Sequence, residues 1–377
     1  MAFSLLTFNV FFSEHEFPSR FAAQLELFRA SSAHVLCLQE VTSRFTAALQ
    51  QASQSPEHSA WLSAYAWSGC PLSPSVWYGT GALVLKSLSP GFSRLPLPTD
   101  MGRDLLLISV APQPACPVLI GCVHLESMEN PELRRQQLQD CAEALQSSAC
   151  AVLCGDFNFC STWSFKAMQK AGCFPAPEAA AASGSSSSSS SSGSSAGSAP
   201  LQGPPAEQEG SEQPAPFSLR LPASVFRSGS PVPPLSQRES LQPPALRSSC
   251  SSSSRQPRPL ENAALAELLP LFTDAWPALH PDPAAEPGFT FDSTVNSMLS
   301  KYEQMRYDRV LFKLPGWSLQ SIRLLGTQPV QKQGAGGAEA CSSSSSSSGF
   351  ATPTKRPAPV FASDHVAVLA TFELPPR

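Results

Sequence analysis

Positive charge is scarce in this chain. Only 14% of its 377 residues are charged, and 25 Lys and Arg stand against 29 Asp and Glu, so the formal net charge is −4. A protein that coats long duplex DNA needs an excess of Lys and Arg to neutralise phosphates. The composition argues against such a protein, but it leaves room for a local basic patch that holds a short nucleic-acid end.

Long apolar runs and paired cysteine motifs are also missing. No apolar run has the length of a transmembrane helix, and residues 3–12 are followed at once by acidic residues without a preceding Lys or Arg, unlike a signal peptide. The 11 cysteines include no C-x-x-C pair and their number is odd, which argues against a zinc site and a disulfide framework. We expect a soluble protein with reduced thiols, located in the nucleus and also in the cytoplasm, without a membrane partner.

Proline and serine, in contrast, are abundant and unevenly distributed. Residues 175–259 and 333–357 are rich in Ser and Pro and contain few residues that could form a core. Motif-bearing sequence resumes after each stretch, and long surface insertions cost little closure entropy. We therefore predict a single domain over residues 1–377, interrupted by two disordered insertions at 175–259 and 333–357.

Elsewhere the hydrophobic periods predict a mixture of strands and helices. A helical stripe of Phe and Leu begins at Phe17, and further helices are expected at 131–147 and 164–171. Strands outnumber helices, which predicts an α/β fold with two packed sheets and helices outside. The expected strands cover residues 4–10, 35–39, 81–85, 105–111, 118–123, 151–154, 309–313, 320–325 and 366–374.

Polar residues stand at the ends of several of these strands. Glu40 follows the apolar run 35–38, where a carboxylate is costly unless it is paired or holds a cation. Oxygen ligands of this kind favour Mg²⁺ or Mn²⁺. The alternative is an ordinary glutamate at the beginning of a helix.

Asp156 and Asn158 follow another apolar strand and Gly155. Alternate residues of an extended segment point the same way, so both side chains can face one site. Asp156 would orient or deprotonate a water, and Asn158 would donate to charged phosphoryl oxygens. The alternative is an Asx turn, which the same residues also favour.

Histidines provide the next candidates. His124 ends the strand 118–123 with Ser127 close behind, although a histidine there can also be purely structural. Asp308 precedes one strand and His365 precedes the last, and we pair them. A carboxylate on one imidazole nitrogen would fix the tautomer, favour the cationic ring and leave the other nitrogen for a phosphate oxygen. The alternative for Asp308 is a surface ion pair with Arg309.

Together these motifs resemble the endonuclease/exonuclease/phosphatase superfamily. The resemblance rests on F-N at 8–9, L-Q-E-V at 38–41, H-L-E-S at 124–127, G-D-F-N at 155–158 and S-D-H at 363–365. It implies a four-layered α/β sandwich of two mixed sheets flanked by helices. The stretches at 101–103, 132–138, 290–292 and 305–309 are similar to the tyrosyl-DNA phosphodiesterase 2 branch.

The resemblance also implies a metal-dependent phosphodiesterase with assigned roles. Mg²⁺, with Mn²⁺ as a substitute, would be held by Glu40 with Asn9 and Asp364 nearby, while Asp156 would handle the attacking water. The catalytic set is Asp156, Asn158, His365, Asp308 and His124. The residues implied for substrate binding are Ser127, Arg103, Phe291, Arg306 and Tyr307.

The implied substrate is the single-stranded 5′ end of DNA that carries a tyrosyl or peptide adduct from a stalled topoisomerase 2. Hydrolysis would leave a 5′-phosphate, and the enzyme is expected to act as a monomer. Three other phosphohydrolases stay open as alternatives: an abasic-site endonuclease, an RNA exonuclease or deadenylase, and an inositol or lipid phosphatase. A non-enzymatic adaptor is a further alternative.

Two positions depart from the branch pattern. Cys160 stands where the branch carries an arginine, so a phosphate contact is lost or supplied by Arg103 or Lys166. Phe291 stands where a tryptophan is usual.

Overall fold

The computed structural model describes residues 2–113, 116–161, 260–300, 303–330 and 358–374. The predicted insertions at 175–259 and 333–357 and the predicted helix at 164–171 lie outside these residues. The described residues all belong to one compact unit, formed by residues 1–176 together with 256–377. None of the helices within them is long and apolar enough to cross a membrane.

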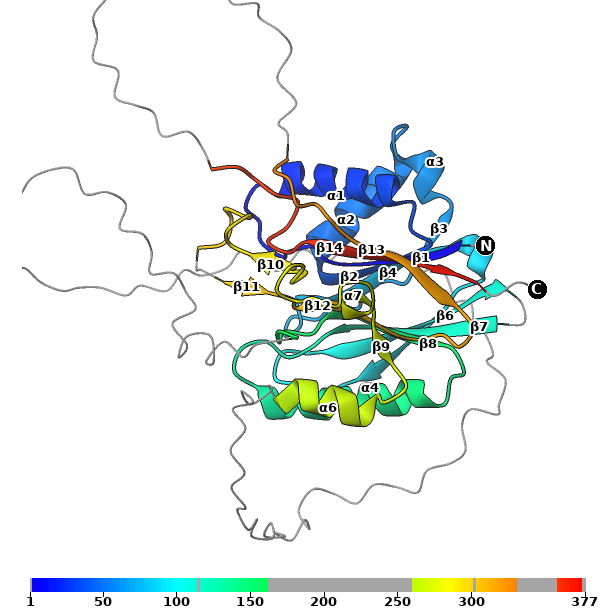
Figure 1. Ribbon diagram of the computed structural model, residues 1–377. Coiled ribbons are helices and arrows are strands. Elements are labelled where there is room, and N and C mark those ends of the chain that lie inside the picture. Colours follow the sequence, from blue (N-terminus) through cyan, green and yellow to red (C-terminus); the bar gives the residue numbers. More distant parts are fainter. Residues whose placement is uncertain (1, 114–115, 162–259, 301–302, 331–357, 375–377) are drawn as a thin grey trace, which may run out of the picture. The chain divides into compact units, whose positions relative to one another are not determined.

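Two six-stranded sheets form the centre of this unit (Figure 1). Each sheet is mixed, because β1 and β2 run parallel in the first and β7 and β8 in the second, while the other neighbours are antiparallel. The first sheet has the order β13 (Ser318–Leu325), β14 (Ala367–Glu373), β1 (Ala2–Asn9), β2 (Val35–Thr42), β4 (Tyr78–Leu85) and β3 (Tyr65–Trp67). The second has the order β5 (Gly91–Pro96), β6 (Asp104–Gln113), β7 (Cys116–His124), β8 (Ala151–Asp156), β12 (Asp308–Lys313) and β9 (Thr273–Asp274).

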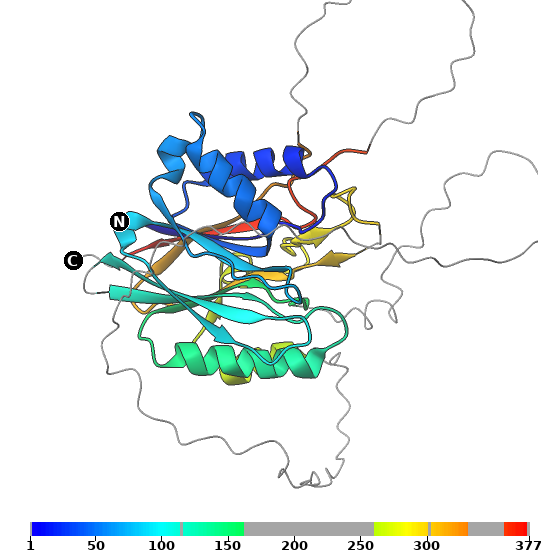
Figure 2. The ribbon, with the colours of Figure 1, turned by 180° about the vertical axis from the view of Figure 1, so that it is seen from behind.

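Helices cover the outer face of each sheet (Figures 1 and 2). On the first sheet lie α1 (Phe17–Ser31), α2 (Ser43–Gln54) and α3 (Ser59–Leu62), and on the second lie α4 (Pro131–Gln146) and α6 (Leu260–Leu268). The remaining elements are the short helices η1 (Lys86–Leu88) and α7 (Ala275–Leu279) and a separate hairpin of β10 (Phe291–Asp292) and β11 (Gln304–Met305).

Side chains along each central strand point alternately toward the other sheet and toward the outer helices, which explains the layered packing. In β2, Cys37 belongs to the core between the two sheets, whereas its neighbours Leu36 and Leu38 pack under α1 and α2. In β8, Val152 faces the other sheet and Leu153 packs against α4 and α6. Strands buried on both faces read as continuous apolar runs because neither face is left to water. The four-layered α/β sandwich expected from the sequence is confirmed.

Candidate active site

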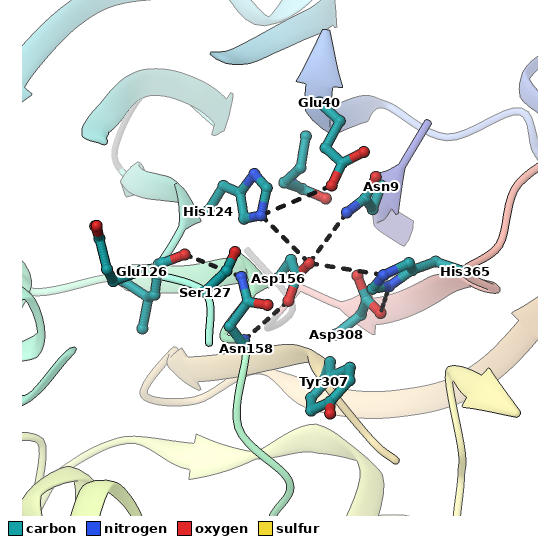
Figure 3. A network of polar contacts seen from close by, with 12 residues as sticks. Asn9, Glu40, His124, Glu126, Ser127, Asp156, Asn158, Tyr307, Asp308 and His365 are labelled. Carbon is teal, nitrogen blue, oxygen red and sulfur yellow. Dashed lines mark hydrogen bonds and ion pairs between the residues drawn. The ribbon is translucent and has the colours of Figure 1, made fainter. Parts of the chain in front are cut away.

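The two pairs of parallel strands bring polar side chains to the same edge of the sandwich. Asn9 ends β1 and Glu40 lies near the end of β2, while His124 ends β7 and Asp156 ends β8. Ligand sites of α/β proteins form at the carboxyl ends of such strands. Asp308 reaches the same place from β12, where it lies opposite Asp156 in the register (Figure 3).

Asp156 lies at the centre of this cluster and is 1% exposed. Its Oδ2 accepts a hydrogen bond from Asn9 Nδ2 at 3.0 Å, and its Oδ1 accepts one from the backbone nitrogen of Asn158 at 2.8 Å. Burial alone raises the pKa of Asp156, but the positive charge of His365 and these donors outweigh it and lower the pKa below its ordinary value. Asp156 is therefore a carboxylate at neutral pH, with acceptor capacity left for a water.

The turn after β8 aims Asp156 into the cluster. Gly155 has φ 140°, and a Cβ there would collide with the carbonyl oxygen of Val123 in β7. Asn158 has φ 54°, in the left-handed region that asparagine tolerates, and its Nδ2 donates to the carbonyl of Leu125 at 2.9 Å. The bond from the backbone nitrogen of Asn158 to Asp156 Oδ1 forms the Asx turn that was considered as an alternative. This turn directs the other oxygen of Asp156 toward Asn9 and the histidines.

The predicted contact between Asp308 and His365 is also present. His365 Nδ1 lies 2.7 Å from Asp308 Oδ2. Burial alone lowers the pKa of His365, but Asp308 and Asp156 outweigh it and raise the pKa well above its ordinary value. With Nδ1 donating to Asp308, the Nε2–H of the cationic ring faces Asp156 Oδ2 at 3.8 Å.

His124 lies on the other side of Asp156 and is neutral. Arg103 Nη1 lies 3.1 Å from His124 Nδ1, and Arg103 Nη2 donates to Ser127 Oγ at 3.0 Å. Burial and the adjacent Arg103 lower the pKa of His124 to about 3. Since arginine can only donate, Nδ1 must accept, and the ring proton lies on Nε2, 3.5 Å from Asp156 Oδ2.

Glu40 and Asp364 form an acidic pair next to this centre. A β-bulge between Leu38 and Val41 and a φ of 59° at Glu40 turn its side chain out of β2, and Glu40 Oε2 accepts from the backbone nitrogen of Phe12 at 2.9 Å. Burial and the charge of Asp364 raise the pKa of Glu40 to about 7. Glu40 lies within a strand, before the helix cap at Thr42, so it is not the helix-starting glutamate of the alternative.

These two carboxylates fit a divalent cation. Each is a partly buried carboxylate whose negative charge is costly, and burial also raises the pKa of Asp364. A hard cation would compensate both charges, and oxygen donors are the ligands that Mg²⁺ and Mn²⁺ prefer. Asp156, Asp308 and His365 also have ligand atoms within 4.8 Å of one another, but a cation there would compete with the bond between Asp308 and His365. Among the described residues we therefore favour the pair Glu40 and Asp364.

Aromatic rings border the cluster beside His365. The ring centroid of Phe291 lies 5.0 Å from that of His365 and 5.6 Å from that of Tyr307. Cys160 is buried against Met305 together with these two aromatic side chains. The position where an arginine is usual thus belongs to a small apolar cluster.

Arg306 lies apart from the cluster. Its Nη1 and Nη2 donate to Asp274 at 3.0 and 2.7 Å, and its Nε donates to Ser161 at 2.9 Å. Asp274 binds Arg309 as well, at 2.7 Å, so the considered pair of Asp308 with Arg309 does not form. Arg306 has the contacts of a residue that stabilises the fold around Asp274.

Several supporting residues carry no clear sequence signal. Thr290 Oγ1 accepts from the backbone nitrogens of Tyr307 and Asp308 at 3.1 and 3.0 Å, and the buried Glu126 accepts from Thr99 and Gln137 at 2.6 and 3.0 Å. Each fixes a loop on which a site residue lies. Glu126 belongs to the H-L-E-S stretch, so its motif was visible, although its role as a loop anchor was not.

Solved structures with the same fold include two of TDP2. The chain is 17% identical to truncated Caenorhabditis elegans TDP2 (TM-score 0.53, covering 99% of this chain and 97% of the other). It is 14% identical to D. rerio TDP2 in complex with a single-strand DNA product (TM-score 0.54, covering 99% of each chain). The human Nocturnin catalytic domain with bound sulfate is 12% identical (TM-score 0.50, covering 99% of this chain and 93% of the other).

These likenesses show that the chain has the same fold as these structures. No curated protein matches the sequence. The model of the Endonuclease/Exonuclease/phosphatase family, however, matches residues 6–365, a range that includes the strand ends described above. The chain therefore belongs to the endonuclease/exonuclease/phosphatase family.

Proposed function

We propose that this protein is a Mg²⁺-dependent phosphodiesterase that hydrolyses 5′-phosphotyrosyl–DNA bonds and leaves a 5′-phosphate, as in the repair of stalled topoisomerase 2 adducts. Mn²⁺ is expected to substitute. We also propose that it acts as a monomer on single-stranded 5′ ends, in the nucleus and also in the cytoplasm. The described cysteines form no disulfide with one another, which agrees with either compartment.

The arrangement around Asp156 supports the reaction class. The cationic His365 and the neutral His124 direct their Nε2–H groups toward the same region from two sides, at 3.8 and 3.5 Å from Asp156 Oδ2. Donors fixed in a buried site stabilise the negative charge that develops on phosphoryl oxygens. Asp156 would accept the proton of the attacking water.

The aromatic pair beside His365 carries the substrate assignment. Phe291 and Tyr307 lie next to the ring that would contact the phosphate, and bases of single strands stack on such rings. The similarity to TDP2 structures, one with single-strand DNA product, agrees with this choice. A tyrosine phenolate leaves more readily than a sugar alkoxide, because the pKa of the tyrosine hydroxyl is about 10.

Glu40 and Asp364 would hold the cation, which supplies Lewis acidity at the phosphoryl oxygens when it is bound. The chain's own residues would bind the strand through Phe291 and Tyr307 and orient the water through Asp156. Ser127, which Arg103 fixes, would contact the phosphate. Asn158 would donate to the same group through its amide, in addition to its bond to Leu125.

The test is turnover of a 5′-tyrosyl oligonucleotide. We expect Asp156→Asn and Glu40→Gln to lower kcat by at least about 100-fold, because one removes the proton acceptor and the other a cation ligand. Matched controls are Asp282→Asn and Glu143→Gln, which change exposed side chains away from the cluster. Chelation of divalent cations should abolish turnover, and Mg²⁺ or Mn²⁺ should restore it.

Wild-type activity in Asp156→Asn or Glu40→Gln would refute the site. The same preparation should be offered abasic duplex, poly(A) and phosphoinositide. Cys160 favours keeping these alternatives in the test, since an apolar side chain stands where a phosphate contact is usual. A clear preference for one of them would replace the 5′-tyrosyl assignment and leave the reaction class in place.

A further inference from the structure

A second aromatic surface lies beside the candidate active site, on the side of Glu40. A pocket of about 560 Å³ is lined by Phe12 and Trp77 together with the charged residues Glu14 and Arg44. The backbone nitrogen of Phe12 donates to Glu40, so this lining residue connects the pocket to the acidic pair. Figure 3 shows Glu40 and Tyr307 on opposite sides of Asp156. The two aromatic surfaces therefore lie on either side of the reacting position.

The rings of this surface are exposed but held in fixed positions. Trp77 is 53% exposed and Phe12 is 36% exposed. Phe12 stacks on Tyr78 with ring centroids 5.2 Å apart, and Trp77 contacts both rings at 4.8 and 4.7 Å. Tyr78 in turn lies 5.8 Å from the ring of His124. The surface is thus continuous with the catalytic cluster, and the exposed parts of Phe12 and Trp77 are available to a ligand.

The charges of the pocket do not suit a nucleic-acid strand. Arg44 is paired with Glu14, and both side chains are about half exposed or more. Glu14 adds a negative charge that would repel the phosphates of a DNA strand, and it already pairs with the arginine that lines this pocket. Exposed Phe12 and Trp77 rings can instead bury apolar side chains of a polypeptide, as aromatic residues do in protein interfaces.

We propose that this pocket, defined by Phe12, Trp77, Glu14 and Arg44, binds the polypeptide attached to the departing tyrosine. This inference rests on the proposed function. The phosphorus of a 5′-tyrosyl bond carries the strand and the tyrosine as diverging substituents. With the strand on Phe291 and Tyr307, the tyrosine and its peptide extend past Glu40 into the pocket.

The test compares two substrates that share the same oligonucleotide. One carries a single tyrosine at its 5′ end, and the other carries a tyrosine within a neutral peptide of about ten residues, which is long enough to fill the pocket. Wild-type protein should have a lower KM for the peptide substrate. Trp77→Ala should raise that KM about tenfold, as for a buried aromatic anchor, with kcat nearly unchanged. The KM for the free-tyrosine substrate should change much less, and Trp77→Phe should restore most of the preference. Leu271→Ala is the control, because Leu271 is 73% exposed and is not a lining residue of this pocket.

A second measurement separates this inference from the proposed function. Binding of the fluorescently labelled, dephosphorylated tyrosyl peptide to wild type and Trp77→Ala needs no turnover. If the peptide binds through Trp77 but no 5′-tyrosyl substrate is hydrolysed, the pocket stands and the proposed function fails. If both substrates are hydrolysed with equal KM, the pocket proposal is wrong. It is also wrong if Trp77→Ala alters the dependence on strand length and not on the peptide, because the pocket would then bind bases.

Discussion

At the scale of single residues, burial and the neighbouring charges decide what each histidine of the site can do. Asp308 makes His365 a cation, whereas Arg103 and burial keep His124 neutral. Both rings nevertheless present an N–H group to the region of Asp156. Two identical side chains thus become a charged donor and a neutral donor at one site, because their partners differ.

Arg103 can be tested as the positioning residue of His124. In Arg103→Ala, Nδ1 of His124 loses its donor, so the proton is no longer confined to Nε2. We expect kcat on a 5′-tyrosyl oligonucleotide to fall by at least about tenfold, because the variant loses the hydrogen bond to His124 and also the one to Ser127 Oγ. The imidazole ¹⁵N chemical shifts of His124 should report a changed tautomer, and Arg323→Ala, an exposed arginine of β13, should alter neither. An unchanged spectrum in Arg103→Ala would mean that another group fixes the tautomer.

At the scale of elements, short strands and loops hold the site more than long helices do. Asp274 in the two-residue strand β9 binds Arg309 of β12 and Arg306 next to it, and also caps α7 through the backbone nitrogen of Trp276. These contacts fix the segment on which Tyr307 and Asp308 lie. A buried ion-paired triad of this kind is costly to break, since one missing partner leaves charges uncompensated.

Asp274 makes a prediction about acid stability. Burial alone raises its pKa, but Arg309 and Arg306 outweigh burial and lower the pKa to about 2 from an ordinary value of 3.8. The unfolded chain therefore takes up the proton first as the pH falls. The stabilisation, roughly 2 kcal/mol, is complete above pH 3.8 and is lost between 3.8 and about 2.

The measurement is urea unfolding of wild type and Asp274→Asn across this pH range. At neutral pH the variant should have an unfolding free energy lower by about 3 kcal/mol, and the difference from wild type should shrink as the pH falls below 3.8. Asp282→Asn, at an exposed turn, serves as the control. A difference that stays constant down to about pH 2 would contradict the assigned pKa.

At the scale of the whole molecule, the site lies where two sheets meet. Asn9 of the first sheet donates to Asp156 of the second, and Ser363, just before β14, donates to the carbonyl of Asn9 at 2.6 Å. The catalytic geometry thus depends on how the sheets pack, which the core between them fixes. On either side of residues 162–259, Asn262 Nδ2 donates to the carbonyl of Cys160 at 2.9 Å, so these two positions already lie in contact.

This contact predicts that residues 175–259 can be replaced by a short Gly-Ser linker. Each halving of a loop lowers its closure cost by about 0.6 kcal/mol, so the thermal midpoint should be unchanged or slightly higher. Activity on a 5′-tyrosyl oligonucleotide should persist. The same linker in place of residues 131–146, which form α4, should prevent folding, because that helix covers the second sheet. Loss of folding in the first variant would show that 175–259 belong to the core.

The sequence predicted the elements with the strongest periods. The nine strands expected correspond to β1, β2, β4, β6, β7, β8, β12, β13 and β14, with ends shifted by at most a few residues, and the helices at Phe17 and 131–147 are α1 and α4. It missed α2, whose buried stripe is only Phe45, Leu49 and Ala52. It also missed the helices α3, α6 and α7, the strands β3 and β5, and the two-residue strands β9 to β11. The two-residue strands are too short to have a period of their own, and tertiary contacts alone define them.

The amino-acid sequence by itself determined which side chains stand at strand ends, because alternation and apolar runs are local properties. It could not determine the partners of those side chains. Arg306 was expected at the substrate and binds Asp274, while Arg103 holds His124 and Ser127, and Trp77 and Phe12 were not singled out at all. Hydrogen bonds, burial and charge compensation join residues far apart in the chain. Only the packing of the two sheets decides which of them meet.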